Sequence, residues 1–161
     1  MKKLKLYFDA SSIGRLDEPS IADAMNDMHE LWRMIKVNIY DVVISQIVLD
    51  EINAISESIK RTTLENYLNQ IDYEYSGITD EMKSIANMII HNGILTQKSY
   101  NDCIHIACAI IRDCDCIVSY NFRHLKNVRT IHGVRAISNL FGYGNVDIFT
   151  AKELIQKGEH K

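Results

Sequence analysis

Short apolar runs that suit buried β-strands alternate in this sequence with longer stretches that have the periodicity of amphipathic helices. The strand-like runs are residues 4–8, 42–44 and 116–119. Between them, residues 20–36 and 99–112 place apolar side chains at steps of three and four. Strands joined by helices pair in parallel, because a parallel crossover needs a connection of helix length. The sequence therefore predicts an α/β fold, with a parallel sheet covered by helices on both faces.

The middle of the chain is predicted to be helical. Ser45 suits the N-cap of a helix that holds apolar residues from Ile47 to Ile59, and residues 62–71 and 81–91 indicate two more helices. At 161 residues, without repeats or a flexible linker, the chain has the size of one domain. We expect this domain to span residues 1–150, followed by a frayed tail at 151–161.

Charge, cysteine content and hydropathy restrict the possible partners and the cellular location of the protein. The net charge of −3 gives no overall basic field, so any nucleic acid must bind through a local patch. All four cysteines lie between Cys103 and Cys116, which favours a reducing, cytoplasmic location over a disulfide framework. No apolar run approaches the roughly 20 residues that span a bilayer, so no membrane association is expected.

Three acidic residues follow or flank the predicted strands. Asp9 comes directly after the first strand, Glu51 lies in the helix after the second, and Asp102 lies in the helix before the last. In folds with a parallel sheet, bound molecules lie at the carboxyl ends of the strands. We therefore expect the three carboxylates to lie together at that edge of the sheet. Clustered carboxylates repel one another unless a cation lies between them, and oxygen ligands suit Mg²⁺ or Mn²⁺. Such ions promote phosphodiester hydrolysis.

Each residue also has a purely structural interpretation. Asp9 is a suitable helix cap, Glu51 a suitable solvated helix residue, and Asp102 a carboxylate favoured by the dipole at a helix start. On the same predicted helix, Cys103, His105 and Cys108 lack the spacing of helical zinc ligands. We expect those two thiols to be buried packing residues.

Four segments of the sequence, in the same order, resemble the PIN-domain family of metal-dependent ribonucleases, which includes the VapC-like toxins of toxin–antitoxin pairs. These segments are Leu6–Ser11, Ile44–Glu51, Asn101–Ala107 and Asp115–Phe122. The resemblance covers nearly the whole chain. It implies a three-layer α/β/α fold around a central parallel sheet of four to five strands, and a metal-dependent endoribonuclease that is the toxin of such a pair.

The resemblance also implies roles for particular residues. Asp9, Glu51 and Asp102 would be catalytic ligands of Mg²⁺ or Mn²⁺, and Ser11 and Ser119 would orient them or a bound water. Many family members have a fourth aspartate where this chain has Asn121, whose amide can offer a carbonyl oxygen but no charge. The family further implies a small antitoxin that covers the acidic site, and a homodimer formed through helices on the flank of the sheet.

A basic stretch after the last predicted strand is the candidate RNA-binding patch. It runs from Phe122 to Arg135 without an acidic residue, and it is equally compatible with a solvated face. Its basic residues are Arg123, Lys126, Arg129 and Arg135, with His124 and His132. Tyr120 and Phe122 lie beside it and are suitable for stacking on bases, although for Phe122 we expect core packing.

Other interpretations are weaker or remain open. A haloacid-dehalogenase-type phosphatase requires a second acid two residues after the first, where this chain has Ser11. A P-loop or dinucleotide fold requires glycine motifs that are missing. The alternative that stays open is a catalytically weak PIN-like module that binds RNA or a partner protein, with Asn121 marking a lost charge.

Overall fold

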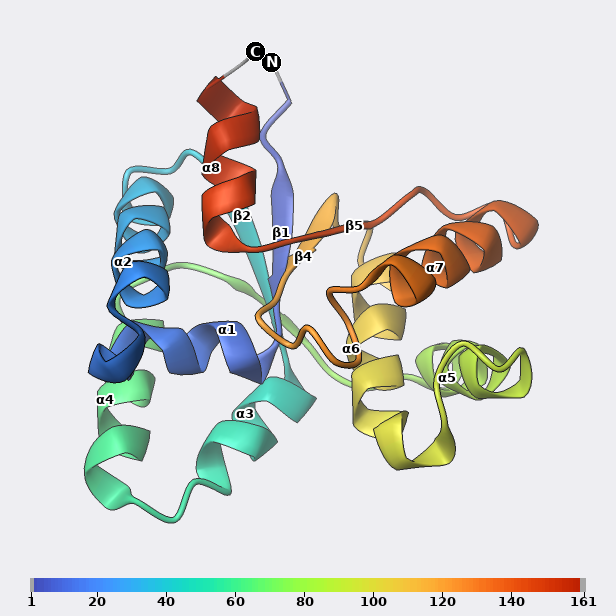
Figure 1. The fold of residues 1–161 in the computed structure, drawn as a ribbon, viewed down its shortest axis with the longest axis horizontal. Coiled ribbons are helices and arrows are strands. Elements are labelled where there is room, and N and C mark those ends of the chain that lie inside the picture. The colour runs from blue at the N-terminus through green and yellow to red at the C-terminus, as the bar shows by residue number, and fades with distance from the viewer. Residues whose placement is uncertain (1, 160–161) are drawn as a thin grey trace.

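A five-stranded sheet forms the centre of the protein, and the computed structural model describes residues 2–159 of the chain (Figure 1). All neighbouring strands pair in parallel, in the order β3-β2-β1-β4-β5. The strands are β1 (Lys5–Phe8), β2 (Asp41–Ser45), β3 (Glu74–Ser76), β4 (Cys116–Val118) and β5 (Asp147–Phe149). The predicted parallel sheet of four to five strands is thus confirmed.

Helices cover both faces of this sheet (Figure 1). On one side lie α1 (Ala10–Gly14), α2 (Ala22–Lys36) and α8 (Ala151–Glu159), and on the other α5 (Asp80–His91), α6 (Tyr100–Ile111) and α7 (Val128–Leu140). Helices α3 (Gln46–Asn53) and α4 (Ser58–Leu68) follow the carboxyl end of β2. Residues 2–159 also contain three short 3-10 helices: η1 (Arg15–Asp17), η2 (Pro19–Ile21) and η3 (Gln97–Ser99). The arrangement is the predicted three-layer α/β/α fold.

Apolar spacing explains how the two helical layers attach. Helix α2 buries one stripe, which consists of Met28, Leu31, Trp32 and Ile35. Helix α6 is different, because every residue from Cys103 to Ile110 is buried. It lies between the sheet and α5, so it has no solvated face in this stretch and any polar side chain there needs an internal partner. His105 is such a side chain.

Several elements differ from the sequence-based expectation. The predicted helix from Ile47 to Ile59 is broken after Asn53, and Ile59 lies in α4 with 78% of its surface exposed. Strands β3 and β5 have only three residues each and lacked a recognisable run. Helix α7 occupies much of the stretch that we considered only as a basic patch.

The region predicted as a frayed tail from residue 151 is helix α8 in the structure. It packs beside α2 and buries Ala151 and Leu154. The backbone N–H of Ala151 also donates to the Tyr120 hydroxyl at 3.3 Å. This packing holds the segment in place, and residues 160–161 lie outside the described part of the chain. Within residues 2–159, no helix has both the length and the apolar character needed to cross a bilayer.

Candidate active site

The candidate site lies where β1, β2 and β4 end. Phe8, the last residue of β1, is paired with Val118, the last residue of β4, so Asp9 and Ser119 leave the sheet at the same level. Ser45 ends β2 and is the N-cap of α3. The parallel register thus brings together residues that are far apart in sequence, at the edge where the sequence predicted chemistry.

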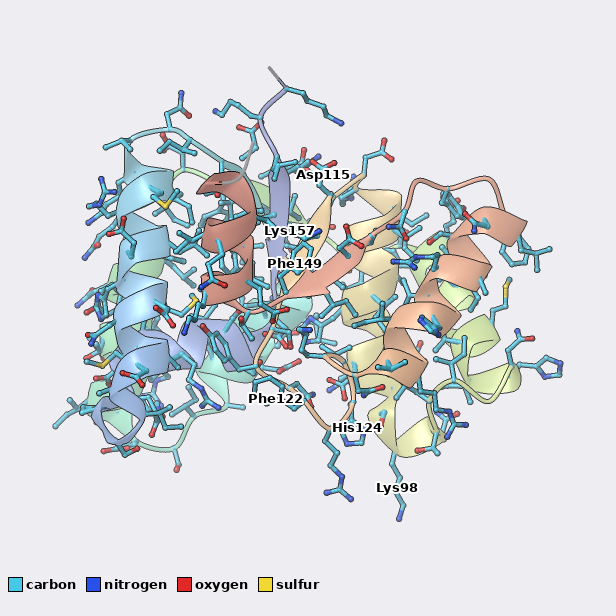
Figure 2. The ribbon with its side chains drawn as sticks, turned by 45° about the horizontal axis from the view of Figure 1, so that its top comes forward. Lys98, Asp115, Phe122, His124, Phe149 and Lys157 are labelled. Carbon is cyan, nitrogen blue, oxygen red and sulfur yellow. The ribbon has the colours of Figure 1, made fainter. Side chains whose placement is uncertain are left out.

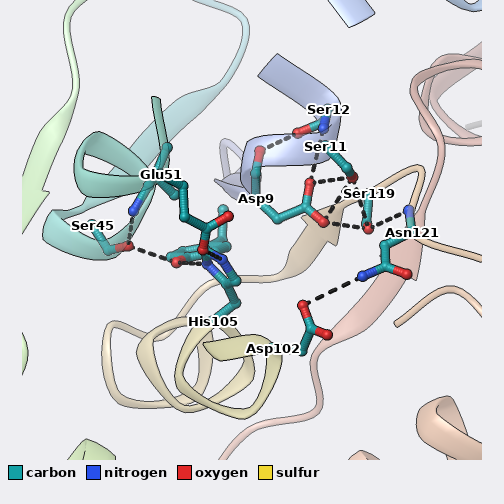
Figure 3. A network of polar contacts seen from close by, with 11 residues as sticks. Asp9, Ser11, Ser12, Ser45, Glu51, Asp102, His105, Ser119 and Asn121 are labelled. Carbon is teal, nitrogen blue, oxygen red and sulfur yellow. Dashed lines mark hydrogen bonds and ion pairs between the residues drawn. The ribbon is translucent and has the colours of Figure 1, made fainter. Parts of the chain in front are cut away.

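Asp9 is fixed at this edge by a ring of hydrogen-bond donors (Figure 3). Its side chain is the N-cap of α1 and accepts from the backbone N–H of Ser12 at 2.9 Å. The Ser11 hydroxyl donates to both carboxylate oxygens, at 2.8 and 2.9 Å, and the Ser119 hydroxyl donates to Oδ2 at 2.6 Å. Asp9 is only 2% exposed, so burial removes most of its hydrogen bonds from water. The ring of protein donors takes the place of those hydrogen bonds.

The same two serines connect the site to the loop after β4. The Ser11 hydroxyl accepts from the backbone N–H of Tyr120 at 3.0 Å, and the Ser119 hydroxyl accepts from that of Asn121 at 3.0 Å. Each serine therefore accepts from this loop and donates to Asp9. That Ser11 and Ser119 orient metal ligands or a bound water stays a prediction.

Glu51 is fixed by a buried chain of polar side chains (Figure 3). His105 Nε2 donates to Glu51 Oε1 at 2.7 Å, and His105 Nδ1 lies 2.6 Å from the Tyr7 hydroxyl. The Tyr7 hydroxyl is 2.7 Å from Ser45 Oγ. His105, Tyr7 and Ser45 are buried, whereas the Glu51 side chain is 33% exposed. A buried anchor thus holds a carboxylate whose other oxygen faces the site.

The protonation of His105 follows from its partners. A carboxylate only accepts hydrogen bonds, so Nε2 carries a proton whether the ring is neutral or charged. Burial lowers the pKa of His105, but the hydrogen bond and charge of Glu51, with Asp9 and Asp102, outweigh it, and the net pKa is raised. Burial also raises the pKa of Tyr7 well above its usual value, so Tyr7 stays a neutral phenol.

Asp102 lies in the first turn of α6 and is the least satisfied of the three carboxylates. It accepts a single side-chain hydrogen bond among the described residues, from Asn121 Nδ2 at 3.3 Å. Burial raises the pKa of Asp102, and the charges of Asp9 and Glu51 raise it further, although His105 and His124 oppose them. A partly buried carboxylate next to two others is a site that a cation would stabilise.

Asn121 has its amide nitrogen, and not its carbonyl, turned toward Asp102. The carbonyl oxygen accepts from the backbone N–H of His124 at 3.0 Å, which fixes the orientation of the amide because a flipped group would place two donors together. An amide N–H cannot bind a cation. In this arrangement Asn121 therefore restrains Asp102 and adds no ligand.

Figure 3 shows Asp9, Glu51 and Asp102 around one space, each from a different element. As they stand, no three His, Cys, Asp or Glu side chains among residues 2–159 are close enough to hold a metal ion. The carboxylate oxygens nevertheless suit a hard divalent cation. Burial and the charges of Asp9 and Glu51 raise the pKa of Asp102, and the second oxygen of Glu51 and of Asp102 accepts no hydrogen bond from the described residues. The neighbouring Asp50 is exposed and accepts from Gln46 Nε2 at 2.7 Å.

The predicted RNA-binding residues have different surroundings. Arg123 is exposed, and its guanidinium forms no hydrogen bond or ion pair within residues 2–159. Arg129 donates to the Gly93 carbonyl at 2.6 Å, whereas Lys126 pairs with Glu153 at 3.2 Å. Phe122 is 56% exposed, so the expectation that it packs in the core is wrong.

Sequence reasoning missed the Tyr7–His105 anchor. A signal was present, since Tyr7 lies in an apolar strand and His105 on an apolar helix, and buried polar groups need partners. Only the fold identifies those partners, because Tyr7, Glu51 and His105 come from β1, α3 and α6.

Comparisons with known proteins agree with this fold. The family model for the PIN domain matches residues 21–130. None of the curated proteins matches the chain in sequence.

The solved structures that are similar to the chain include two VapC-type proteins. One is VapC20 of Mycobacterium tuberculosis, described as a sarcin–ricin loop cleaving toxin, with a TM-score of 0.58 and 14% identity over 74% of this chain and 92% of that one. The other is VapBC2 from Rickettsia felis bound to a promoter DNA fragment, with a TM-score of 0.58 and 12% identity over 91% of this chain and 98% of that one. At such identities the likeness concerns the fold.

Proposed function

The chain belongs to the PIN domain family, and we propose that it is an endoribonuclease that hydrolyses RNA phosphodiester bonds with Mg²⁺ or Mn²⁺ at the Asp9–Glu51–Asp102 site. The observation that carries the proposal is the environment of Asp102. Its carboxylate is partly buried, has one long hydrogen bond, and has its pKa raised by burial and by the charges of Asp9 and Glu51. A bound cation would offset this cost.

In this proposal each acidic residue contributes one ligand and is held by its own partner. Ser11, Ser12 and Ser119 fix Asp9, and His105 fixes Glu51. Asp102 is the carboxylate with most freedom to move toward the ion. When bound, Mg²⁺ or Mn²⁺ would lower the pKa of a water molecule and polarise a phosphoryl oxygen, so no protein nucleophile is needed.

The test is cleavage of a panel of single-stranded and structured RNAs in Mg²⁺, in Mn²⁺ and in EDTA. Asp102→Asn is the informative variant, because it removes a ligand charge without changing volume and disturbs only one long hydrogen bond. Asp9→Asn is a poorer choice, since it would place an amide among three donors to Asp9. The matched control is Asp50→Asn, which alters an exposed neighbour of Glu51.

Metal-dependent cleavage that is lost in Asp102→Asn and kept in Asp50→Asn would support the nuclease. Equal cleavage by wild type and Asp102→Asn would remove Asp102 from the site. No cleavage by wild type, with RNA still bound, would favour the weak binding module. That second function is favoured by the orientation of Asn121, which offers an N–H to Asp102 where many relatives have a fourth carboxylate.

The biological setting is part of the same proposal. Because the similar VapC20 is described as a toxin, and the sequence resembles the VapC-like toxins, we propose that the chain is a toxin. The family resemblance further supports a small antitoxin that covers the acidic site and a homodimer as the assembly. Expression of the wild type should arrest growth, and Asp102→Asn should not. Co-expression with the product of an adjacent small gene should restore growth and yield a complex that purifies as one species.

A further inference from the structure

A pocket of about 270 Å³ lies beside the acidic site and shares no lining residue with it. The loop after α5, the end of η3 and the segment from Arg123 to Thr130 form its walls. Its volume falls just below the range of about 300–1,000 Å³ that drug-sized ligands occupy. A single phosphate with its sugar is therefore a better match than a larger ligand.

The lining of this pocket combines the apolar side chains of Ile94 and Leu95 with the guanidinium groups of two arginines. Arg123, His124 and Arg129 face it together with hydroxyl and amide groups of Thr96, Ser99 and Asn127, and no Asp or Glu lines it. The protein as a whole carries a net charge of −3, so the pocket is a local reversal of sign. Such a reversal attracts an anion to one place and not to the surface in general.

Local contacts hold the lining in place before any ligand arrives. The Arg129 guanidinium donates to the Gly93 carbonyl at 2.6 Å, which ties the start of α7 to the loop after α5. His124 Nδ1 lies 3.0 Å from Ser99 Oγ, and the Thr130 hydroxyl donates to the His124 carbonyl at 2.7 Å. Arg123 remains exposed and free to reach a ligand.

Two hydrogen bonds connect this pocket to the acidic site. The His124 backbone N–H donates to Asn121 Oδ1 at 3.0 Å, and Asn121 Nδ2 donates to Asp102 Oδ1 at 3.3 Å. Figure 2 shows Phe122, His124 and Lys98 along the same edge of the molecule. The two arginines of the pocket therefore lie in the segment that directly follows Asn121, next to the acidic site.

We propose that this pocket binds a backbone phosphate of unpaired RNA, adjacent to the phosphate at the acidic site, through Arg123, His124 and Arg129. The inference rests on the proposed ribonuclease function and adds a subsite to it. The acidic site repels phosphate until a cation is bound, so the pocket supplies the affinity that the carboxylates cannot. It thereby sets which phosphate along the strand reaches Asp102.

The experiment measures binding apart from cleavage. Fluorescence anisotropy of a labelled, single-stranded, mixed-sequence RNA is titrated with the full-length chain in EDTA at several salt concentrations. We expect Arg123→Ala and Arg129→Ala each to weaken binding by roughly tenfold and to reduce the salt slope by about one. Arg129→Ala also loses the hydrogen bond to the Gly93 carbonyl. Arg123→Ala is the cleaner variant, because the Arg123 guanidinium forms no hydrogen bond or ion pair with the described residues.

The matched control is Arg135→Ala on α7, which removes the same charge but lies outside the pocket and pairs with Asp147 at 3.6 Å. We expect this variant to bind RNA within about twofold of wild type. Equal losses in Arg135→Ala and Arg123→Ala would show a diffuse field and overturn the pocket. Unchanged binding in both pocket variants would overturn it too.

The pocket and the nuclease can fail separately. Wild-type cleavage with unaltered RNA binding in Arg123→Ala and Arg129→Ala rejects the pocket and leaves the nuclease standing. Binding that depends on these arginines, without cleavage by wild type in any metal, supports the pocket and rejects the nuclease.

Discussion

His105 Nε2 lies 2.7 Å from Glu51 Oε1, so a fully buried imidazole holds one of the three site carboxylates. The imidazole is in turn held by Tyr7, whose hydroxyl is 2.6 Å from Nδ1. Groups that orient a ligand from behind often matter nearly as much as the ligand itself. Three elements, α3, α6 and β1, thus meet at a single side chain.

We expect His105→Gln to lower the cleavage rate by about 10- to 100-fold, because Glu51 loses its fixed donor. Calorimetry should show a similar loss of Mn²⁺ affinity, which a purely structural defect would leave unchanged. The effect should vanish in a Glu51→Gln background, since the histidine acts through Glu51. Additive losses in the double variant would contradict this role.

Tyr7→Phe tests the buried end of the same chain. The substitution removes one hydroxyl and leaves His105 Nδ1 and Ser45 Oγ without that partner in a buried environment. We expect the free energy of unfolding to fall by about 1–3 kcal/mol, measured by urea denaturation. A change below about 0.5 kcal/mol would mean that water or another group replaces the hydroxyl.

Asn121→Asp should tighten Mn²⁺ binding, by roughly tenfold or about 1.4 kcal/mol. The new carboxylate can still accept from the His124 N–H, but it loses the N–H that donates to Asp102 and adds a like charge there. Without metal, the variant should therefore be less stable than wild type, and Mn²⁺ should restore its stability. Unchanged affinity in calorimetry would sink the prediction.

Phe122→Ala should weaken binding of unpaired RNA by about 1–3 kcal/mol, because an exposed aromatic ring stacks on a base. The ring is 56% exposed and contacts Tyr120 edge-on, with 6.3 Å between ring centroids. The free energy of unfolding of the same variant should lie within about 0.5 kcal/mol of the wild-type value. Phe122→Leu, which keeps an apolar side chain without the aromatic face, should lose affinity as Phe122→Ala does.

The buried thiols predict a loss of stability in alkali. Burial raises the pKa of Cys103 and Cys114 to about 12 and that of Cys108 to about 11, and Cys116 is raised as well. Unfolded thiols ionise near pH 8.5, roughly, so above that pH the unfolded chain releases protons that the folded chain keeps. The stability is complete below that pH and falls as pH rises.

Each thiol should contribute about 1.4 kcal/mol per pH unit to this fall. Urea denaturation at a series of pH values from neutral to mildly alkaline measures the slope. Cys114→Ala should reduce this slope by the contribution of one thiol. A wild-type free energy of unfolding that does not change with pH over this range would contradict the prediction. The thiols should also resist alkylation in the folded protein.

The sequence by itself determined the parts of this protein that rest on local patterns. Apolar periodicity identified β1, β2, β4, α2 and α6, and the position of Asp9 directly after a strand placed it at the carboxyl edge of the sheet. These predictions succeed because burial and capping depend on residues only a few positions apart. The family resemblance added the order of the acidic segments.

Only the tertiary structure decided the remaining features, because their partners lie far apart in the chain. Strands β3 and β5 exist through pairing with β2 and β4, and α8 is held by packing on α2. The Asn121 amide nitrogen faces Asp102 because the His124 N–H donates to the amide oxygen. Lys126 forms an ion pair with Glu153. A short strand, an amide orientation or an ion pair is set by non-local contacts, which no local pattern records.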